Sequence, residues 1–316
     1  MYSRGPVQYQ NPVTATLIAV RDSVARPNRP LPLDPADRLD GVNALVTGAT
    51  GGLGVPLVER LASRGARVIC SGRSSAASTV AAIEARGGEA EDRPVDLADL
   101  RSIDALVDSI DRELSLVVLC AGIVPAKSRP TAQGFEIAIG VNYLAHAYLV
   151  DRLRRAGMLR RGRLVVVASE AHRSTDSFDL PGLAVADDYS IGAAVKRYGY
   201  TKALLVTWAQ EAARRFAPEL AVHTICPGPV ESKITREAPG WAQAMMGPVM
   251  KAFFSPGELA AEPVVYLAAS RALEGRTGAY FHRWIDKQPS DLACDEAVAA
   301  RLYDATYELL QKRSEA

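Results

Sequence analysis

The sequence predicts an α/β protein in which helices cover both faces of a doubly wound parallel sheet, as a three-layer α/β/α sandwich. The first observation is a series of short apolar runs rich in β-branched residues, at positions 44–46, 68–70, 116–119, 164–167 and 221–225. These runs are continuous instead of alternating, which is typical of strands buried on both faces. The second observation is that longer amphipathic stretches separate them. We predict crossover helices at 55–64, 102–113 and 203–216.

Composition excludes several other classes of protein. The 37 basic and 36 acidic residues nearly cancel, so no long-range field favours nucleic acid. The four cysteines are scattered, and there is neither a CxxC pair nor a histidine at metal-ligand spacing, which indicates a reduced, cytoplasmic protein without a metal. The apolar stretch at 13–20 is too short to span a bilayer, so we expect neither an integral membrane segment nor a cleaved signal.

The chain is predicted to be one domain with an N-terminal appendage, residues 1–38. Four prolines between residues 26 and 37 forbid a continuous helix there and separate the appendage from the domain. Apolar residues at helical spacing within 11–25 predict a short amphipathic helix that lies on the domain or on a partner. Residues 39–316 then form a single nucleotide-binding domain that ends in a C-terminal helix.

A glycine-rich loop follows the first predicted strand and opens the first helix. Glycines let the backbone approach a pyrophosphate closely, and its charge is stabilised by free N–H groups at a helix N-terminus. The residues expected at the phosphates are Gly48, Thr50, Gly51, Gly52, Leu53 and Gly54. An ordinary glycine-rich turn is the alternative. The strand–loop–helix context favours nucleotide binding and a Rossmann-type fold.

The end of the second predicted strand favours NADP(H) over NAD(H). An NAD-binding protein usually has an Asp or Glu there to hold the ribose hydroxyls, whereas this chain has Gly72 and Arg73. No carboxylate repels a ribose phosphate, and a guanidinium suits one. A solvated cation at a helix start is the alternative for Arg73. After the third strand, we expect Asp96 to accept from the adenine amino group and Leu97 to pack near the ring.

A tyrosine and a lysine four residues apart form the candidate catalytic pair. Tyr198 and Lys202 lie at the predicted start of a helix, on one face, close enough for the ammonium to influence the phenol. The pair follows a buried strand that ends at Ser169 and precedes one that ends near Pro227. Both strand ends lie on the carboxyl edge of the sheet, where ligands bind in such folds.

Together these motifs resemble the short-chain dehydrogenase/reductase family over residues 40–313, and most closely its single-domain, retinol dehydrogenase-like members. The matching segments, in chain order, are 47–54, 120–122, 140–142, 169, 198–202, 227–228 and 278–281. The glycine loop alone also fits the pattern of the sugar-nucleotide branch. The chain departs from the family in having Leu119-Cys120 where Asn-Asn is common, and Ala168-Ser169 where Ser-Ser is common.

The resemblance implies a role for each residue of the candidate site. Tyr198 would be the general acid. A free phenol has a pKa of about 10, which a neighbouring ammonium and a positively charged nicotinamide would lower. Lys202 would supply that field and bind the nicotinamide ribose, Ser169 would hydrogen-bond the substrate oxygen, and Asn142 would hold a water linking Lys202 to solvent.

Further cofactor contacts follow from the same resemblance. The residues implied are Ala121, Gly122, Pro227, Gly228 and Val230. Each candidate also has a structural alternative. Ser169 can cap a strand end, Asn142 can hydrogen-bond within a helix, and Pro227 can belong to a turn.

A substrate lid is expected over about 230–256, because this region folds over the substrate in the family. Its methionines and aromatic residues suit an apolar guest: Trp241, Met245, Met246, Met250, Phe253 and Phe254. Core or oligomer packing is the alternative. We expect an NADP(H)-dependent oxidoreductase acting on a lipophilic aldehyde or ketone and the matching alcohol.

Two other functions stay open from the sequence. One is a catalytically silent NADP-binding regulator, since fold does not imply function. The other is a dehydratase or epimerase acting on a nucleotide sugar. The resemblance also implies a homodimer or homotetramer that pairs through the helices of residues 142–155 and 198–216.

Overall fold

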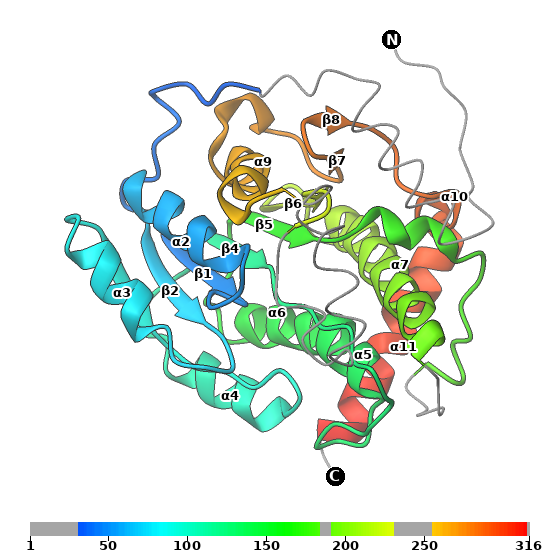
Figure 1. Cartoon of the computed structure of the whole chain (residues 1–316). Helices are drawn as coiled ribbons and strands as arrows, with labels where there is room; N and C mark the ends of the chain where they lie inside the picture. The colour runs from blue at the N-terminus through cyan, green and yellow to red at the C-terminus, as the bar shows by residue number, and fades with distance from the viewer. Residues whose placement is uncertain (1–30, 184–190, 231–254, 315–316) are drawn as a thin grey trace.

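The computed structural model describes residues 31–183, 191–230 and 255–314, which form one sheet with helices on both faces (Figure 1). The described strands follow the order β3-β2-β1-β4-β5-β6-β7-β8. Their bounds are β1 Asn43–Thr47, β2 Arg67–Ser71, β3 Glu89–Asp92, β4 Leu116–Leu119, β5 Gly162–Val167, β6 Leu220–Cys226, β7 Tyr280–His282 and β8 Ile285–Asp286. Neighbouring strands run parallel from β3 to β7, and β8 is antiparallel to β7. The predicted Rossmann-type, three-layer fold is confirmed.

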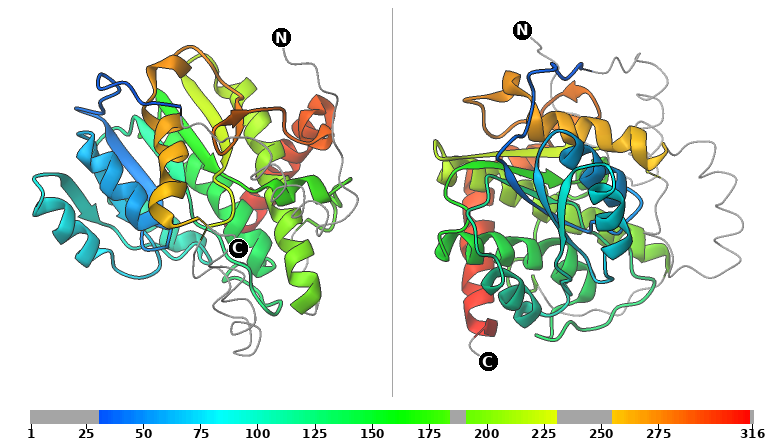
Figure 2. Two further views of the ribbon diagram at one scale, coloured as in Figure 1. Left: turned by 45° about the horizontal axis from the view of Figure 1, so that its top comes forward. Right: turned by 90° about the vertical axis from the view of Figure 1, so that its left-hand side faces the viewer.

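The helices divide between the two faces of the sheet (Figure 2). One face carries α2 (Gly54–Ser63), α3 (Ala77–Glu84) and α9 (Gly257–Ala269). The other carries α4 (Leu100–Asp108), α6 (Ala145–Arg155) and α7 (Ile191–Phe216), with α11 (Glu296–Ser314) packed outside them. Among the described helices, none combines the length and the apolar composition that a membrane span needs.

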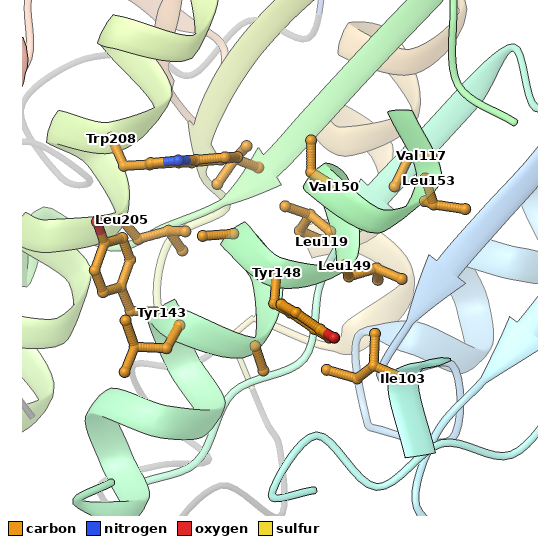
Figure 3. Packing of buried hydrophobic residues seen from close by; sticks show 14 of the residues in the cluster. Ile103, Val117, Leu119, Tyr143, Tyr148, Leu149, Val150, Leu153, Leu205 and Trp208 are labelled. Atoms are coloured by element: carbon orange, nitrogen blue, oxygen red, sulfur yellow. The ribbon is translucent and has the colours of Figure 1, made fainter. Parts of the chain in front are cut away.

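Each central strand contributes side chains to two separate apolar cores. In β1, Leu45 packs with α4, α6 and α7, whereas Ala44 and Val46 pack with α2 and α9. Figure 3 shows the first core, in which Trp208 of α7 and Leu149 of α6 lie over the sheet. Because both faces are covered, the strands are apolar at successive positions, as the sequence indicates.

The last helix packs across α6 and α7. The hydroxyl of Tyr143 lies 2.5 Å from that of Thr306, and the indole of Trp208 donates to the hydroxyl of Tyr307 at 3.3 Å. Tyr307 in turn donates to the carbonyl of Ala147 at 3.4 Å. A second subunit that paired on the outer side of α6 and α7 would therefore meet α11.

Two helix boundaries differ from the prediction. α7 begins at Ile191 instead of residue 203, carried by helix-forming residues such as Ala193 and Ala194, so the pair at 198 and 202 lies within the helix and not at its start. α4 ends at Asp108 instead of residue 113. The third strand, expected before Asp96 without bounds, is β3, an edge strand of sequence Glu-Ala-Glu-Asp that carries no apolar run because it is partly exposed.

The domain boundary was predicted at residue 38. Residues 1–30, with the predicted amphipathic helix, lie outside the described residues. Leu31 and Leu33 pack against the core beside α2 and α9, and the buried carboxylate of Asp37 accepts from the N–H of Arg271 at 2.9 Å. Part of the predicted linker therefore packs on the domain, while the separate nature of residues 1–30 stays a prediction.

Candidate active site

The candidate site lies at the carboxyl ends of the central strands, where four loops approach one another. The loops follow β1, β4, β5 and β6, and α7 runs beside them. Gly48 has φ +71°, and a Cβ on it would lie 2.8 Å from the Cα of Ala121. A Cβ on Gly122 would lie 3.6 Å from Nζ of Lys202. The glycine at 48 is required by this backbone conformation and close approach.

Tyr198 and Lys202 lie on the same face of α7, as predicted. Nζ of Lys202 is 5.7 Å from the centre of the Tyr198 ring. The ammonium donates to the carbonyl of Val167, at the end of β5, at 3.0 Å. Lys202 is buried, whereas Tyr198 is half-buried. The ammonium is therefore tied to the end of β5, and the Tyr198 ring lies beside it.

The pKa of Tyr198 in the protein without cofactor is set mainly by burial. Burial raises the pKa, the thiol of Cys226 raises it further, and a hydrogen bond with the side chain of Ser169 lowers it. The net direction is upward, whereas the lowered pKa expected from the sequence referred to the ammonium together with a bound, positively charged nicotinamide. The physical reason is that burial outweighs the other effects while the ammonium is directed to Val167. Tyr198 is accordingly a protonated phenol, the form that can donate a proton.

The pKa of Lys202 is shifted in the opposite direction, downward. Burial lowers its pKa from 10.5 to about 8, and the nearby thiols of Cys120 and Cys226 act against this shift. A buried ammonium is unfavourable unless it is paired or hydrogen-bonded. A shifted lysine beside a tyrosine in a strand-end site is the arrangement expected of a functional group.

Ser169 caps the segment that follows β5, which was its structural alternative, and it also lies beside Tyr198, as its expected catalytic role requires. It is the residue before a short 3₁₀ helix, η2 (Glu170–Ser174), and its Oγ accepts from the N–H of Ala171 at 3.2 Å. A hydroxyl that accepts from the backbone can still donate its own hydrogen. Ser169 is half-buried and interacts with Tyr198, so the two hydroxyls lie together.

Asn142 lies in a π-helical turn, Gly140–Leu144, that the sequence did not predict. Its side-chain Oδ1 accepts from the N–H of Ile123 at 2.7 Å, and Nδ2 donates to the carbonyl of Ile123 at 2.9 Å and to Oγ1 of Thr201 at 3.1 Å. The amide thus holds the loop after β4 against α7, next to Lys202. A role in holding a water stays a prediction.

The sequence did not predict a group of polar contacts that joins β1, the loop after β4 and α6. Oγ1 of Thr47 accepts from the N–H groups of Cys120 and Ala121 at 3.0 and 3.3 Å, and it lies 3.3 Å from Nε2 of the buried His146. Burial lowers the pKa of His146 to about 3, so the ring is neutral. A histidine in an apolar helix gives no sequence signal for such a contact.

The glycine loop has the features that a dinucleotide needs. Thr50, Gly51 and Gly52 are exposed, and within the described residues no side chain caps the N-terminus of α2. The N–H of Val55 donates to Gly51 and Pro56 has no N–H, so the N–H groups that can bind an anion here are those of Gly52, Leu53 and Gly54. A Cβ on Gly72 would lie 2.9 Å from Oγ1 of Thr50, so the end of β2 closely approaches this loop.

The expected adenosine contacts lie beside the same loop. Arg73 is exposed directly after Gly72. The neighbouring carboxylate of Asp92 binds the hydroxyl of Ser75 and the N–H of Ala76. Asp96 is exposed, with Oδ1 accepting from the N–H of Ala98 at 2.9 Å. Leu97 is buried in the core.

The two ends of the expected lid meet at the site. Pro227 is buried, Gly228 has φ +88°, and Val230 forms a parallel bridge with Ser255. The lid residues themselves lie outside the described residues: Trp241, Met245, Met246, Met250, Phe253 and Phe254. The chain therefore leaves and re-enters the described structure beside the loop after β6.

A cavity of about 670 Å³ lies elsewhere, at the amino ends of β1, β4, β5 and β6. Arg163, Pro218 and Thr277 are among its lining residues. It is at the opposite end of the strands from Tyr198 and Lys202, so we do not assign the candidate chemistry to it.

The fold and this site define a dinucleotide-binding α/β protein with a tyrosine–lysine pair. A family model described as short chain dehydrogenase matches residues 42–177. Retinol dehydrogenase 13 of Mus musculus is 30% identical over 290 residues, covering 86% of this chain and 84% of that protein. Retinol dehydrogenase 14 of Homo sapiens is 31% identical over 295 residues, covering 84% and 85%. The chain belongs to the short-chain dehydrogenase family and resembles its retinol dehydrogenases.

Solved structures agree with this assignment. An uncharacterised protein from Mycobacterium paratuberculosis has a TM-score of 0.68 and 25% identity, covering 88% of this chain and 97% of that chain. A short chain dehydrogenase from Burkholderia cenocepacia, solved in complex with NADP, has a TM-score of 0.60 and 25% identity, covering 78% and 97%.

Replacing the buried lysine, Lys202, is expected to stabilise the cofactor-free protein. Lys202→Met should raise the free energy of unfolding at pH 7 by about 1–3 kcal/mol, because it removes a buried charge and keeps the side-chain length. Since the pKa of Lys202 is about 8 in the folded chain and near 10.5 unfolded, the unfolded chain holds more protons between these values. The wild type should therefore recover stability relative to the variant as pH rises from 8 towards 10.5.

Urea unfolding at pH 7 and pH 10 measures this difference. Lys312→Met on the exposed side of α11 is the matched control and should change little at either pH. A variant at 202 that is less stable than the wild type at pH 7 would show that the hydrogen bond to Val167 outweighs the burial of the charge.

Proposed function

We propose that this protein is an NADP(H)-dependent oxidoreductase that interconverts a lipophilic aldehyde or ketone and its alcohol. The observation that carries the proposal is the cluster of Tyr198, Ser169 and Lys202 at the carboxyl edge of the sheet, with a protonated phenol beside an ammonium. When bound, NADP(H) supplies or accepts the hydride. The residues of the chain must orient the carbonyl and move one proton.

Each residue has a defined part in carbonyl reduction. The hydroxyl of Ser169 donates to the substrate oxygen and holds it beside Tyr198. Tyr198 donates its proton as negative charge develops on that oxygen, so a neutral alcohol leaves. The charge of Lys202 then stabilises the phenolate, and its ammonium would hold the nicotinamide ribose of the bound cofactor. Oxidation of the alcohol runs the same steps in reverse.

The preference for NADP(H) is supported by the charges at the end of β2, where the adenosine ribose is expected. Arg73 is exposed beside the glycine loop, and the nearby carboxylate of Asp92 is already bound to Ser75 and Ala76. An exposed guanidinium suits a ribose phosphate. The similar structure from Burkholderia cenocepacia contains NADP, which agrees with this choice.

A lipophilic substrate is supported by two observations. The similar proteins from Mus musculus and Homo sapiens are named retinol dehydrogenases, and retinol is an apolar alcohol. The sequence between Val230 and Ser255, whose ends meet at the site, is rich in methionine and aromatic residues. Such side chains suit an apolar guest of irregular shape.

A cytoplasmic homodimer or homotetramer completes the proposal. All four cysteines are free, which agrees with a reducing compartment. Because α11 packs across α6 and α7, subunits that associate there would do so through α11 or around it.

The proposal is tested by NADPH oxidation with retinal, decanal and a quinone. Tyr198→Phe should lower kcat at least about 100-fold, because the proton donor is lost, while NADPH binding followed by its fluorescence is unchanged. Tyr200→Phe is the matched control, since the hydroxyl of Tyr200 contacts Asp179 instead of the site. Full activity of Tyr198→Phe would exclude the proposed acid. Turnover of a nucleotide sugar with none of these carbonyls would favour an epimerase, and no turnover of either with tight NADPH binding would favour a regulator.

The cofactor preference is tested with Arg73→Ala. Loss of the guanidinium should lower kcat/KM for NADPH by about tenfold or more and leave kcat/KM for NADH nearly unchanged, because only NADPH carries the ribose phosphate. Arg301→Ala, an exposed arginine on α11, is the control. Equal losses with both cofactors would contradict the assignment of Arg73.

A further inference from the structure

A buried polar cluster lies directly behind Ser169, and the proposed proton transfer does not use it. Its members come from η2 and from the chain around β7 and β8. They are Glu170, His172, Arg173, Tyr280 and Lys287. Four of them are buried, and Lys287 is half-buried. Buried polar groups of this number need a structural or functional reason.

The protonation of His172 follows from its two partners. The backbone N–H of Ser290 donates to Nε2 at 3.0 Å, so Nε2 carries a lone pair. Nδ1 lies 2.8 Å from the carbonyl of Ser169, which can only accept, so Nδ1 carries the hydrogen. Burial lowers the pKa of His172 to about 3. The imidazole is therefore neutral, in a single tautomer, across the range in which proteins work.

The backbone on both sides of Ser169 is held by β6. The N–H of Ala168 donates to the carbonyl of Ile225 at 2.7 Å, and that of Glu170 donates to Sγ of Cys226 at 3.3 Å. Within the described residues, the carbonyl of Ser169 itself accepts only from His172, through its ring and through its backbone N–H at 3.1 Å. The peptide plane following Ser169 is therefore held by two side chains, the imidazole at its carbonyl and Cys226 at its N–H.

The remaining members hold the imidazole and its helix in place. The rings of His172 and Tyr280 lie 5.1 Å apart, and the Tyr280 hydroxyl donates to Glu170 at 2.6 Å. Lys287 and Arg173 donate to the other carboxylate oxygen of Glu170 at 2.6 and 3.2 Å. Burial alone would raise the pKa of Glu170, but these two cations outweigh it and hold the pKa below its ordinary value.

We propose that His172 is a positioning residue, which orients the Ser169 hydroxyl towards Tyr198 and the substrate oxygen by holding the Ser169 carbonyl. This inference rests on the proposed role of Ser169 in catalysis. Rotation of the 169–170 peptide would displace the hydroxyl, and a donor misplaced by about 1 Å can lower a rate about 100-fold. Through Ser290 and Tyr280, the orientation of the serine also depends on the chain around β7 and β8.

The test is a double-mutant cycle between His172 and Ser169. His172→Phe keeps a ring against Tyr280 and removes both ring hydrogen bonds. It should lower kcat by about 10- to 100-fold, measured with retinal or decanal, whichever the wild type reduces faster. The KM for NADPH and the fluorescence of bound NADPH should be unchanged. In the Ser169→Ala background the same change should cause no further loss beyond about twofold, because its effect acts through the serine.

Two further variants separate positioning from a general effect on structure. His172→Gln offers one donor and one acceptor and should restore kcat to within about fivefold of the wild type. His223→Leu is the matched control. His223 is equally buried, on β6, and within the described residues neither ring nitrogen has a hydrogen-bond partner, so kcat should be unchanged. If His172→Phe does not fold, His172→Asn, which is too short to bridge both partners, takes its place in the cycle.

The outcomes that overturn the proposal are distinct from those that overturn the function. Wild-type kcat in His172→Phe beside an impaired Ser169→Ala would refute the positioning role alone. A full additional loss in the Ser169→Ala background, or no rescue by glutamine, would refute it as well. Wild-type kcat in Ser169→Ala would remove the role of the serine and this inference with it, whereas the oxidoreductase function is judged separately by Tyr198→Phe.

Discussion

The site depends on the hydrogen bond that the buried ammonium of Lys202 makes to the carbonyl at the end of β5. This bond ties α7 to the sheet at the point where the strand ends, and the phenol one helical turn earlier is placed by the same contact. Burial of the ammonium is unfavourable by itself. The chain tolerates it because the sheet below is close-packed on both faces and holds the strand ends in place.

The sequence was sufficient to predict the elements that carry strong, local signals. Five of the buried strands are continuous apolar runs, and the glycine loop is defined by neighbours in the chain. The tyrosine and lysine share a helix, so their spacing alone brings them together. The third strand was expected before Asp96 but without bounds, because an exposed edge strand needs no apolar run, and the start of α7 was not predicted because alanine-rich segments give no clear boundary.

The contacts that the sequence did not predict are between distant segments. Thr47 and His146 are 99 residues apart, and His172 and Ser290 are 118 apart, so neither contact produces a motif. The π-helical turn around Asn142 likewise has no repeating pattern. The raised pKa of Tyr198 shows the same limit. A spacing rule accounts for one neighbouring charge, whereas the observed direction results from burial by the whole surrounding structure.

The bridge between Val230 and Ser255 has a consequence for how this protein and its relatives diverge. Since both ends of the intervening segment are fixed at one point of the framework, a change in its length alters the closing entropy only slowly, by about 0.6 kcal/mol for each doubling. Insertions and new side chains there would leave in place the strands and the residues to which we assign the proton transfer. The proposed function thus assigns guest preference and chemical mechanism to separable parts of one polypeptide, which would let selection alter the first while the second is retained.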